Sequence, residues 1–173
     1  MLYALEDIRQ VHLEISSECN ATCPQCPRNL CGYQHNDGYE EHSMTVTEAQ
    51  KIFTPAFLAQ IDQIAVNGNF GDIVMCPEAV GIFEYFRQHM RENANISVST
   101  NGGARDRAFW TRLAELGVMV QFCIDGLEDT HSIYRRNTVY STVIRNAQTF
   151  IAAGGRAGWK MIDFDHSRHQ QAQ

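Results

Sequence analysis

Residues 11–28 read Val-His-Leu-Glu-Ile-Ser-Ser-Glu-Cys-Asn-Ala-Thr-Cys-Pro-Gln-Cys-Pro-Arg. The first six predict a short β-strand, and Cys19, Cys23 and Cys26 follow it in a C-x3-C-x2-C spacing. Three thiolates on one tight loop can bind three irons of a cubane iron–sulfur cluster. The fourth iron then has no protein ligand, and an open metal position is typical of catalytic rather than structural sites.

A zinc-binding structural or interaction loop is the alternative, with Cys31 or His35 as the fourth ligand. Zinc sites of this kind usually combine one C-x2-C unit with a second, distant pair of ligands. The sequence contains no second cysteine pair of that spacing. The motif therefore favours the iron–sulfur cluster over zinc.

With this motif the chain resembles the radical S-adenosylmethionine (radical SAM) enzymes, and the resemblance extends over most of its length. It implies that Cys19, Cys23 and Cys26 bind a [4Fe-4S] cluster whose open iron chelates S-adenosylmethionine. A flavodoxin- or ferredoxin-like one-electron reductant would drive cleavage of S-adenosylmethionine to a 5'-deoxyadenosyl radical, which abstracts hydrogen from substrate. By analogy the substrate is a peptide or a small metabolite. A catalytically silent iron–sulfur protein is a further alternative.

The composition is that of a soluble globular domain, with 173 residues, 44% hydrophobic and 20% charged. A net charge of −6 argues against a nucleic-acid partner. Because the N-terminus has neither a basic start nor a long apolar run, we expect no signal peptide and no membrane span. Three of the six cysteines are scattered, which indicates a reducing, cytoplasmic compartment rather than a disulfide framework.

Strand-like and helix-like runs alternate, which predicts βαβ units and a parallel sheet. Within the strands, apolar residues such as Ile64 and Val66 alternate with polar ones such as Gln63 and Asn67. Fully buried parallel strands are usually apolar throughout, so we expect one face to line a ligand cavity. The predicted strands are 11–16, 61–68, 95–100, 118–125 and 158–164, and the predicted helices are 45–60, 78–93, 104–116 and 140–153.

The predicted fold class is α/β, a partial (β/α) barrel of the radical SAM type with about five to six parallel strands, because a complete barrel needs about 250 residues. Residues 1–173 are interpreted as a single core domain, either minimal or lacking its last strand and a C-terminal domain. The apolar run 158–164 would leave a bare sheet edge. Such an edge predicts self-association or marginal stability.

The resemblance also assigns the surroundings of S-adenosylmethionine. Backbone groups of Gly68, Asn69 and Phe70 match the family's glycine-rich motif, although Gly-Asn-Phe-Gly-Asp replaces Gly-Gly-Glu and Asp72 is the weaker correspondence. These glycines are expected to allow positive φ and close backbone approach to a ligand. Ser99 and Asn101 are predicted to bind the cofactor carboxylate or ribose, although Asn101 also fits a simple Asn-Gly turn.

Asp125 and Arg135 complete the predicted cofactor shell, with Arg135 as a bidentate partner for the cofactor carboxylate or, alternatively, a solvated surface residue. Cys123 replaces a serine of the family pattern and is interpreted as a small core residue. The segment with Asp165, His166 and His169 would contact substrate or be frayed. The long loop 27–43 is predicted to be a lid over the cluster.

Overall fold

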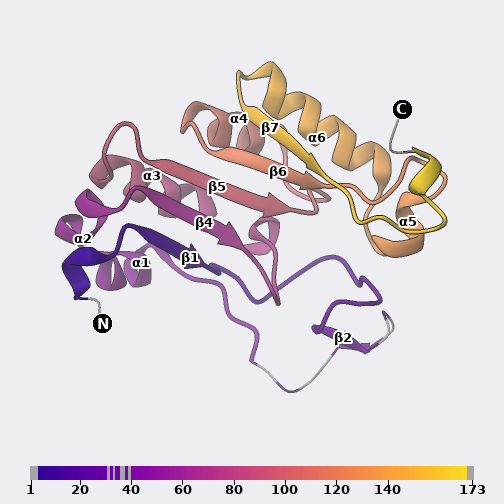
Figure 1. Cartoon of the computed structure of the whole chain (residues 1–173), viewed down its shortest axis with the longest axis horizontal. Helices are drawn as coiled ribbons and strands as arrows, with labels where there is room; N and C mark the ends of the chain where they lie inside the picture. Colours follow the sequence, from indigo (N-terminus) through magenta and orange to yellow (C-terminus); the bar gives the residue numbers. More distant parts are fainter. Residues whose placement is uncertain (1–3, 31, 33, 36–37, 39, 171–173) are drawn as a thin grey trace.

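Five parallel strands form one sheet (Figure 1), as the alternation of elements predicts. The structure is a computed structural model that describes residues 4–30, 32, 34–35, 38 and 40–170. The strands are β1 (Gln10–Leu13), β4 (Gln63–Asn67), β5 (Asn95–Thr100), β6 (Met119–Cys123) and β7 (Arg156–Lys160), in the spatial order β1-β4-β5-β6-β7. The predicted α/β class is confirmed, and the sheet is consistent with the partial barrel.

The helices connect successive strands. They are α1 (Val46–Ile52), α2 (Pro55–Gln60), α3 (Ala79–His89), α4 (Arg107–Glu115), α5 (His131–Tyr134) and α6 (Tyr140–Ala152), with 3-10 turns η1 (Leu5–Asp7), η2 (Ile73–Met75) and η3 (Arg168–Gln170). None of the helices described is both long and apolar enough to cross a membrane.

The predicted helix 45–60 is divided in two at Pro55, which lacks the N–H that a helix interior requires. Thr45 caps α1, because its hydroxyl accepts a hydrogen bond from the Glu48 N–H at 3.2 Å. Thr54 caps α2 in the same way, accepting from the Phe57 N–H at 3.3 Å. Pro55 is then the first residue of α2, where a missing N–H costs little.

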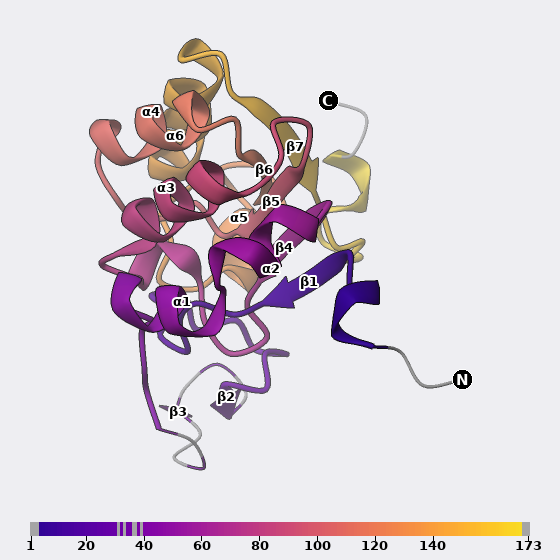
Figure 2. The ribbon, with the colours of Figure 1, turned by 90° about the vertical axis from the view of Figure 1, so that its left-hand side faces the viewer.

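The two faces of the sheet differ as the alternation predicts. Helices α1–α4 and α6 cover one face (Figure 2), onto which side chains such as Ile64, Val98 and Val120 are fully buried. The opposite face carries polar residues such as Ser99 and Gln121, which stay partly exposed. In the described part of the chain no helix covers this polar face, so the sheet leaves one side open.

The last strand and the long loop 27–43 also differ from their prediction. The last strand lies at 156–160 instead of 158–164, and all five of its residues are exposed. The long loop 27–43 contains a short antiparallel hairpin, β2 (Asn29–Leu30) with β3 (Gln34–His35). Its role as a lid stays a prediction, since several of its residues lie outside the described ones.

Candidate functional site

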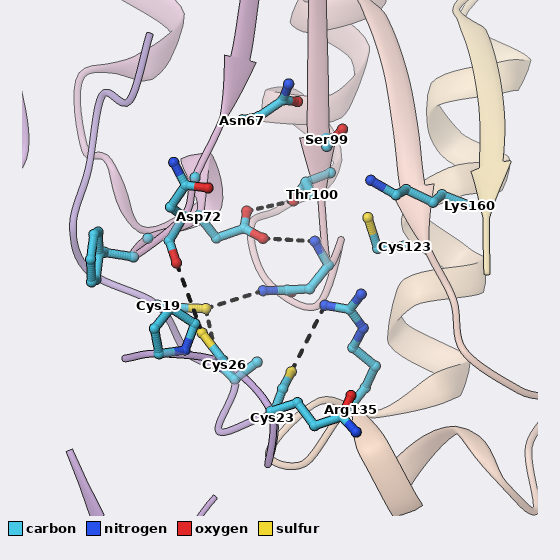
Figure 3. A pocket seen from close by; sticks show the side chains of 18 of the residues that line it. Cys19, Cys23, Cys26, Asn67, Asp72, Ser99, Thr100, Cys123, Arg135 and Lys160 are labelled. Atoms are coloured by element: carbon cyan, nitrogen blue, oxygen red, sulfur yellow. Dashed lines mark hydrogen bonds between the residues drawn. The ribbon is translucent and has the colours of Figure 1, made fainter. Parts of the chain in front are cut away.

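A cavity of about 490 Å³ opens at the carboxyl ends of the parallel strands (Figure 3). Three loops meet there, following β1, β4 and β5, together with α5 and the end of β7. All but one of the predicted site residues line this cavity. They are Cys19, Cys23, Cys26, Gly68, Asn69, Phe70, Ser99, Asn101 and Arg135.

The cysteine loop is fixed by its own backbone and by a distant segment. The Cys26 N–H donates to the Cys23 carbonyl at 3.1 Å, and the Thr22 N–H donates to the Arg136 carbonyl at 3.1 Å. Two of the sulfurs accept hydrogen bonds. The Ala21 N–H donates to Cys19 Sγ at 3.4 Å, and Arg135 Nη1 donates to Cys23 Sγ at 3.8 Å.

The buried side chain of Arg28 holds the cysteine loop in place. This side chain is 2% exposed, and Nη1 donates to the carbonyls of Ser17 and Phe70 while Nη2 contacts the Glu41 carboxylate. One guanidinium thus connects the cysteine loop to the loop after β4. A planar fork with several fixed donors suits such a position better than a lysine would.

Asp72 links the same two loops to β5. Its carboxylate accepts hydrogen bonds from the Thr100 hydroxyl at 2.5 Å, the Asn101 N–H at 2.7 Å and the Val74 N–H at 3.1 Å. Its own N–H donates to the Glu18 carbonyl at 2.8 Å. Burial raises the pKa of Asp72, although these hydrogen bonds act in the opposite direction. Asp72, which matches the family's motif only weakly, therefore joins the cysteine loop, the loop after β4 and the end of β5 in the cavity wall.

Asp125 does not line the cavity but positions Arg135. The Asp125 carboxylate is fully buried, accepts from Arg135 Nε at 2.5 Å and accepts from the Ile162 N–H at 2.6 Å. Burial alone would lower the pKa of Arg135, but the adjacent Asp125, together with Cys23 and Cys123, raises it, and the net shift is upward. Arg135 is therefore a permanent, oriented cation and not a solvated surface residue.

The glycine-rich loop owes its glycines to contacts within the chain. Neither Gly68 nor Gly71 has a positive φ, so that part of our expectation is wrong. A Cβ at Gly68 would lie 1.8 Å from the Gly71 carbonyl oxygen, and one at Gly71 would lie 1.9 Å from that of Ser16. These glycines therefore allow segments of the protein itself to approach each other closely, whereas close approach to a ligand stays a prediction.

Ser99 and Asn101 face the cavity with partners already in place. The Ser99 hydroxyl donates to Gln121 Oε1 at 3.2 Å. The Asn101 amide donates to Asn20 Oδ1 at 3.0 Å and approaches Cys19 Sγ at 3.6 Å, while its oxygen accepts from the Gly103 N–H at 2.7 Å. Their cofactor roles stay predictions, and Asn101 also holds the cysteine loop.

The C-terminal histidines are not brought to the cavity. His166 stacks on Phe164 with ring centroids 5.1 Å apart, whereas His169 is exposed and Asp165 pairs with Arg168. The sequence reasoning missed two positions at the cavity. Glu14 accepts from the Asn69 N–H at 2.9 Å and so shapes the glycine-rich loop, and Lys160 lines the cavity. Glu14 could have been found from the sequence, because it alternates with the apolar residues Leu13 and Ile15 and so belongs to the polar face of the sheet.

The three cysteines offer one cavity three thiols, which is the number of protein ligands that a cubane cluster with one open iron takes. Burial raises the pKa of Cys19 to about 12, with Asp72 adding to the effect, and burial also raises the pKa of Cys23. Metal binding must release these protons, and the N–H donors beside the sulfurs favour the thiolates. Among the described residues, no three Cys, His, Asp or Glu side chains are arranged around a single metal position. Cys31 and the His35 side chain lie outside this description.

None of the protein-family models matches the sequence, and a search of curated proteins finds no match. Solved structures do match. SuiB of Streptococcus suis, bound to S-adenosylmethionine, has a TM-score of 0.72 over 93% of this chain and 35% of its own, at 12% identity. For anSMEcpe with bound S-adenosylmethionine the TM-score is 0.65, over 87% and 43%, at 18% identity. For BtrN in complex with S-adenosylmethionine and 2-DOIA it is 0.58, over 89% and 56%, at 13% identity.

These neighbours are radical SAM enzymes, and the likeness shows that this chain has their core fold, as the resemblance in sequence implies. The chain spans less than two thirds of the length of each of them.

Proposed function

We propose that this chain is the core domain of a radical SAM enzyme of a reducing, cytoplasmic compartment. One observation carries the proposal. The three thiols of a C-x3-C-x2-C loop face a single cavity at the carboxyl ends of parallel strands, together with an oriented arginine. A structural metal loop needs no such cavity, whereas an open catalytic site does.

In this proposal Cys19, Cys23 and Cys26 bind a [4Fe-4S] cluster. When bound and reduced by a flavodoxin- or ferredoxin-like donor, the cluster supplies the electron that cleaves S-adenosylmethionine and yields the hydrogen-abstracting radical. The chain's own residues bind and orient the cofactor. Asp125 orients Arg135 through Nε, and the other N–H groups of the guanidinium can then bind the carboxylate of S-adenosylmethionine.

Backbone acceptors of the glycine-rich loop and the polar side chains of β5 complete the proposed cofactor shell. The Asn69 carbonyl lies 3.9 Å from Cys26 Sγ, and this position supports its role as an acceptor for the cofactor amino group. Ser99 and Asn101 offer hydroxyl and amide groups to the ribose or carboxylate. A peptide or small-metabolite substrate is supported by analogy, because SuiB has been solved with a precursor peptide and BtrN with 2-DOIA.

Anaerobic reconstitution tests the proposal. We expect a brown protein with about four irons and four sulfides per chain, which releases 5'-deoxyadenosine from S-adenosylmethionine when reduced. Cys23→Ala should abolish both properties, whereas Cys123→Ser, a matched change at another cavity thiol, should keep the iron. A colourless protein with stoichiometric zinc would contradict the proposal. A full cluster without cofactor cleavage would indicate the catalytically silent alternative.

A further inference from the structure

Lys160 lines the cavity but has no role in the proposed binding of the cofactor. It ends β7, and its register partner on β6 is Cys123. Both residues line the cavity. In Figure 3 the Lys160 side chain extends over Cys123 in the direction of Ser99. Because alternate residues of a strand point to one face, the register of β7 directs this ammonium group to the open polar face of the sheet.

The other charged groups around the cavity already have partners. Asp125 pairs with Arg135, and the Asp72 carboxylate accepts three hydrogen bonds. Among the described residues, no carboxylate lies within ion-pair distance of Lys160. The cavity therefore carries one cation whose counter-ion is not supplied by the described part of the chain.

The two cavity cations stand at different places and have different chemistry. Arg135 lies beside Cys23, at the end where the cofactor would bind, whereas Lys160 lies on the far side of Cys123 (Figure 3). The chain has 14 Lys and Arg residues, and only Lys51 and Lys160 are lysines. A lysine is a compact point charge with three rotatable donors, which suits an anion that enters in more than one orientation.

We propose that Lys160 binds an anionic group of the substrate, a carboxylate or a phosphate, and thereby holds the substrate against the polar face of the sheet. The inference rests on the proposed function, because it gives the cofactor the cysteine end of the cavity. A cavity of about 490 Å³ is small within the ~300–1,000 Å³ range of ligand pockets. With S-adenosylmethionine bound, the substrate would enter from the open face, where Lys160 is exposed.

Competitive acetylation with acetic anhydride, read by peptide mass spectrometry, tests this on the reconstituted protein loaded with S-adenosylmethionine. Lys51, on α1, is the internal control in the same chain. The probes are millimolar succinate, inorganic phosphate and succinamide, the uncharged match of succinate. We expect succinate or phosphate, at about four times its Kd, to slow acetylation of Lys160 about fivefold because the bound anion protects the amine, and to leave Lys51 unchanged. The protecting anion identifies the substrate class.

Equal protection by succinamide, or protection by none of the probes, would overturn the proposal. Protection by S-adenosylmethionine alone, with nothing added by either anion, would assign Lys160 to the cofactor and overturn it as well. By calorimetry, Lys160→Arg should keep the anion affinity and Lys160→Gln should lose about fivefold, both with unchanged iron content and cofactor affinity. Failure of the proposed function would appear separately, as missing iron or missing cofactor binding in the unmodified protein.

Discussion

At the scale of single residues, His131 makes folding stability depend on pH. It is fully buried on α5, and its Nε2 donates to the Thr138 hydroxyl at 2.9 Å, since that hydroxyl donates onward to the Arg135 carbonyl. Burial, with Arg135 adding to it, lowers the pKa of His131 to about 4. The unfolded chain, with a histidine pKa near about 6.5, therefore binds the extra proton first as the pH falls.

The stability contributed by neutral His131 is thus fully present above about pH 6.5 and is lost as the pH falls toward about 4. Between about pH 7 and pH 5 the loss should be about 2 kcal/mol. Urea unfolding at several pH values, with His131→Gln as the comparison, measures it. The variant should be less stable at neutral pH and flatter in its pH dependence. Parallel curves for the two proteins would refute the assignment.

Residues differ in how far the sequence alone could reveal them. Cys19, Cys23 and Cys26 could be predicted because their spacing is local and chemically specific. The contacts that Asp72 and Glu14 make could not be predicted, because their partners lie far away in the sequence: Thr100 is 28 residues from Asp72, and Asn69 is 55 from Glu14. Only the folded sheet brings such partners together, and a carboxylate with no visible partner looks like an ordinary surface residue.

At the scale of elements, the C-terminal segment holds the loop that leads to Arg135. Gln170 is 3% exposed; its Oε1 accepts from the Leu127 N–H at 2.9 Å and the Thr130 hydroxyl at 2.5 Å, and its amide donates to Asp129 at 2.9 Å. The described part of the tail is therefore docked, which answers the alternative that it is frayed.

Gln170→Ala should cost about 2 kcal/mol of unfolding free energy, because it leaves the buried Thr130 hydroxyl and the partly buried Leu127 N–H without their acceptor. Hydrogen exchange should become faster in the loop from Leu127 to Arg135, and cofactor affinity should fall with it. The neighbouring exposed His169→Ala should stay within about 0.5 kcal/mol of the unmodified protein. Equal effects of the two substitutions would mean that the tail merely rests on the surface.

Boundaries of elements were predictable where the chain carries a local stop signal and poorly predictable where it does not. The break between α1 and α2 could be predicted, because Pro55 lacks the backbone N–H that a helix interior requires. The start of β7 has no such mark, because Arg-Ala-Gly-Trp-Lys is short, exposed and without apolar alternation. The predicted strand was placed too late because apolar residues follow Lys160. One of them, Phe164, lies beyond the strand and packs on Tyr134, with ring centroids 4.6 Å apart.

At the scale of the whole molecule, β7 is one of the two edge strands of the sheet among the described strands, and β1 is the other. Because the strand ends at Lys160, only Trp159 of the predicted apolar run lies on that edge, and its indole N–H donates to the Ile124 carbonyl at 2.7 Å. A cation stands at each end of the strand, at Arg156 and Lys160. Charged edges are a common protection against edge-to-edge pairing.

An antiparallel pairing of two copies centred on Gly158 would place Arg156 opposite the second copy's Lys160, twice. Like charges opposite each other destabilise a strand pair, so we expect the protein to stay monomeric at low ionic strength, which revises the self-association expected from the sequence. Arg156→Glu would turn both repulsions into attractions and should produce a dimer that weakens as salt screens the charges. Sedimentation velocity at micromolar concentration measures this. Arg145→Glu, an exposed position on α6 with the same change in net charge, is the control. A dimer of the unmodified protein at low salt, or a variant that stays monomeric, would show that charge does not control this edge.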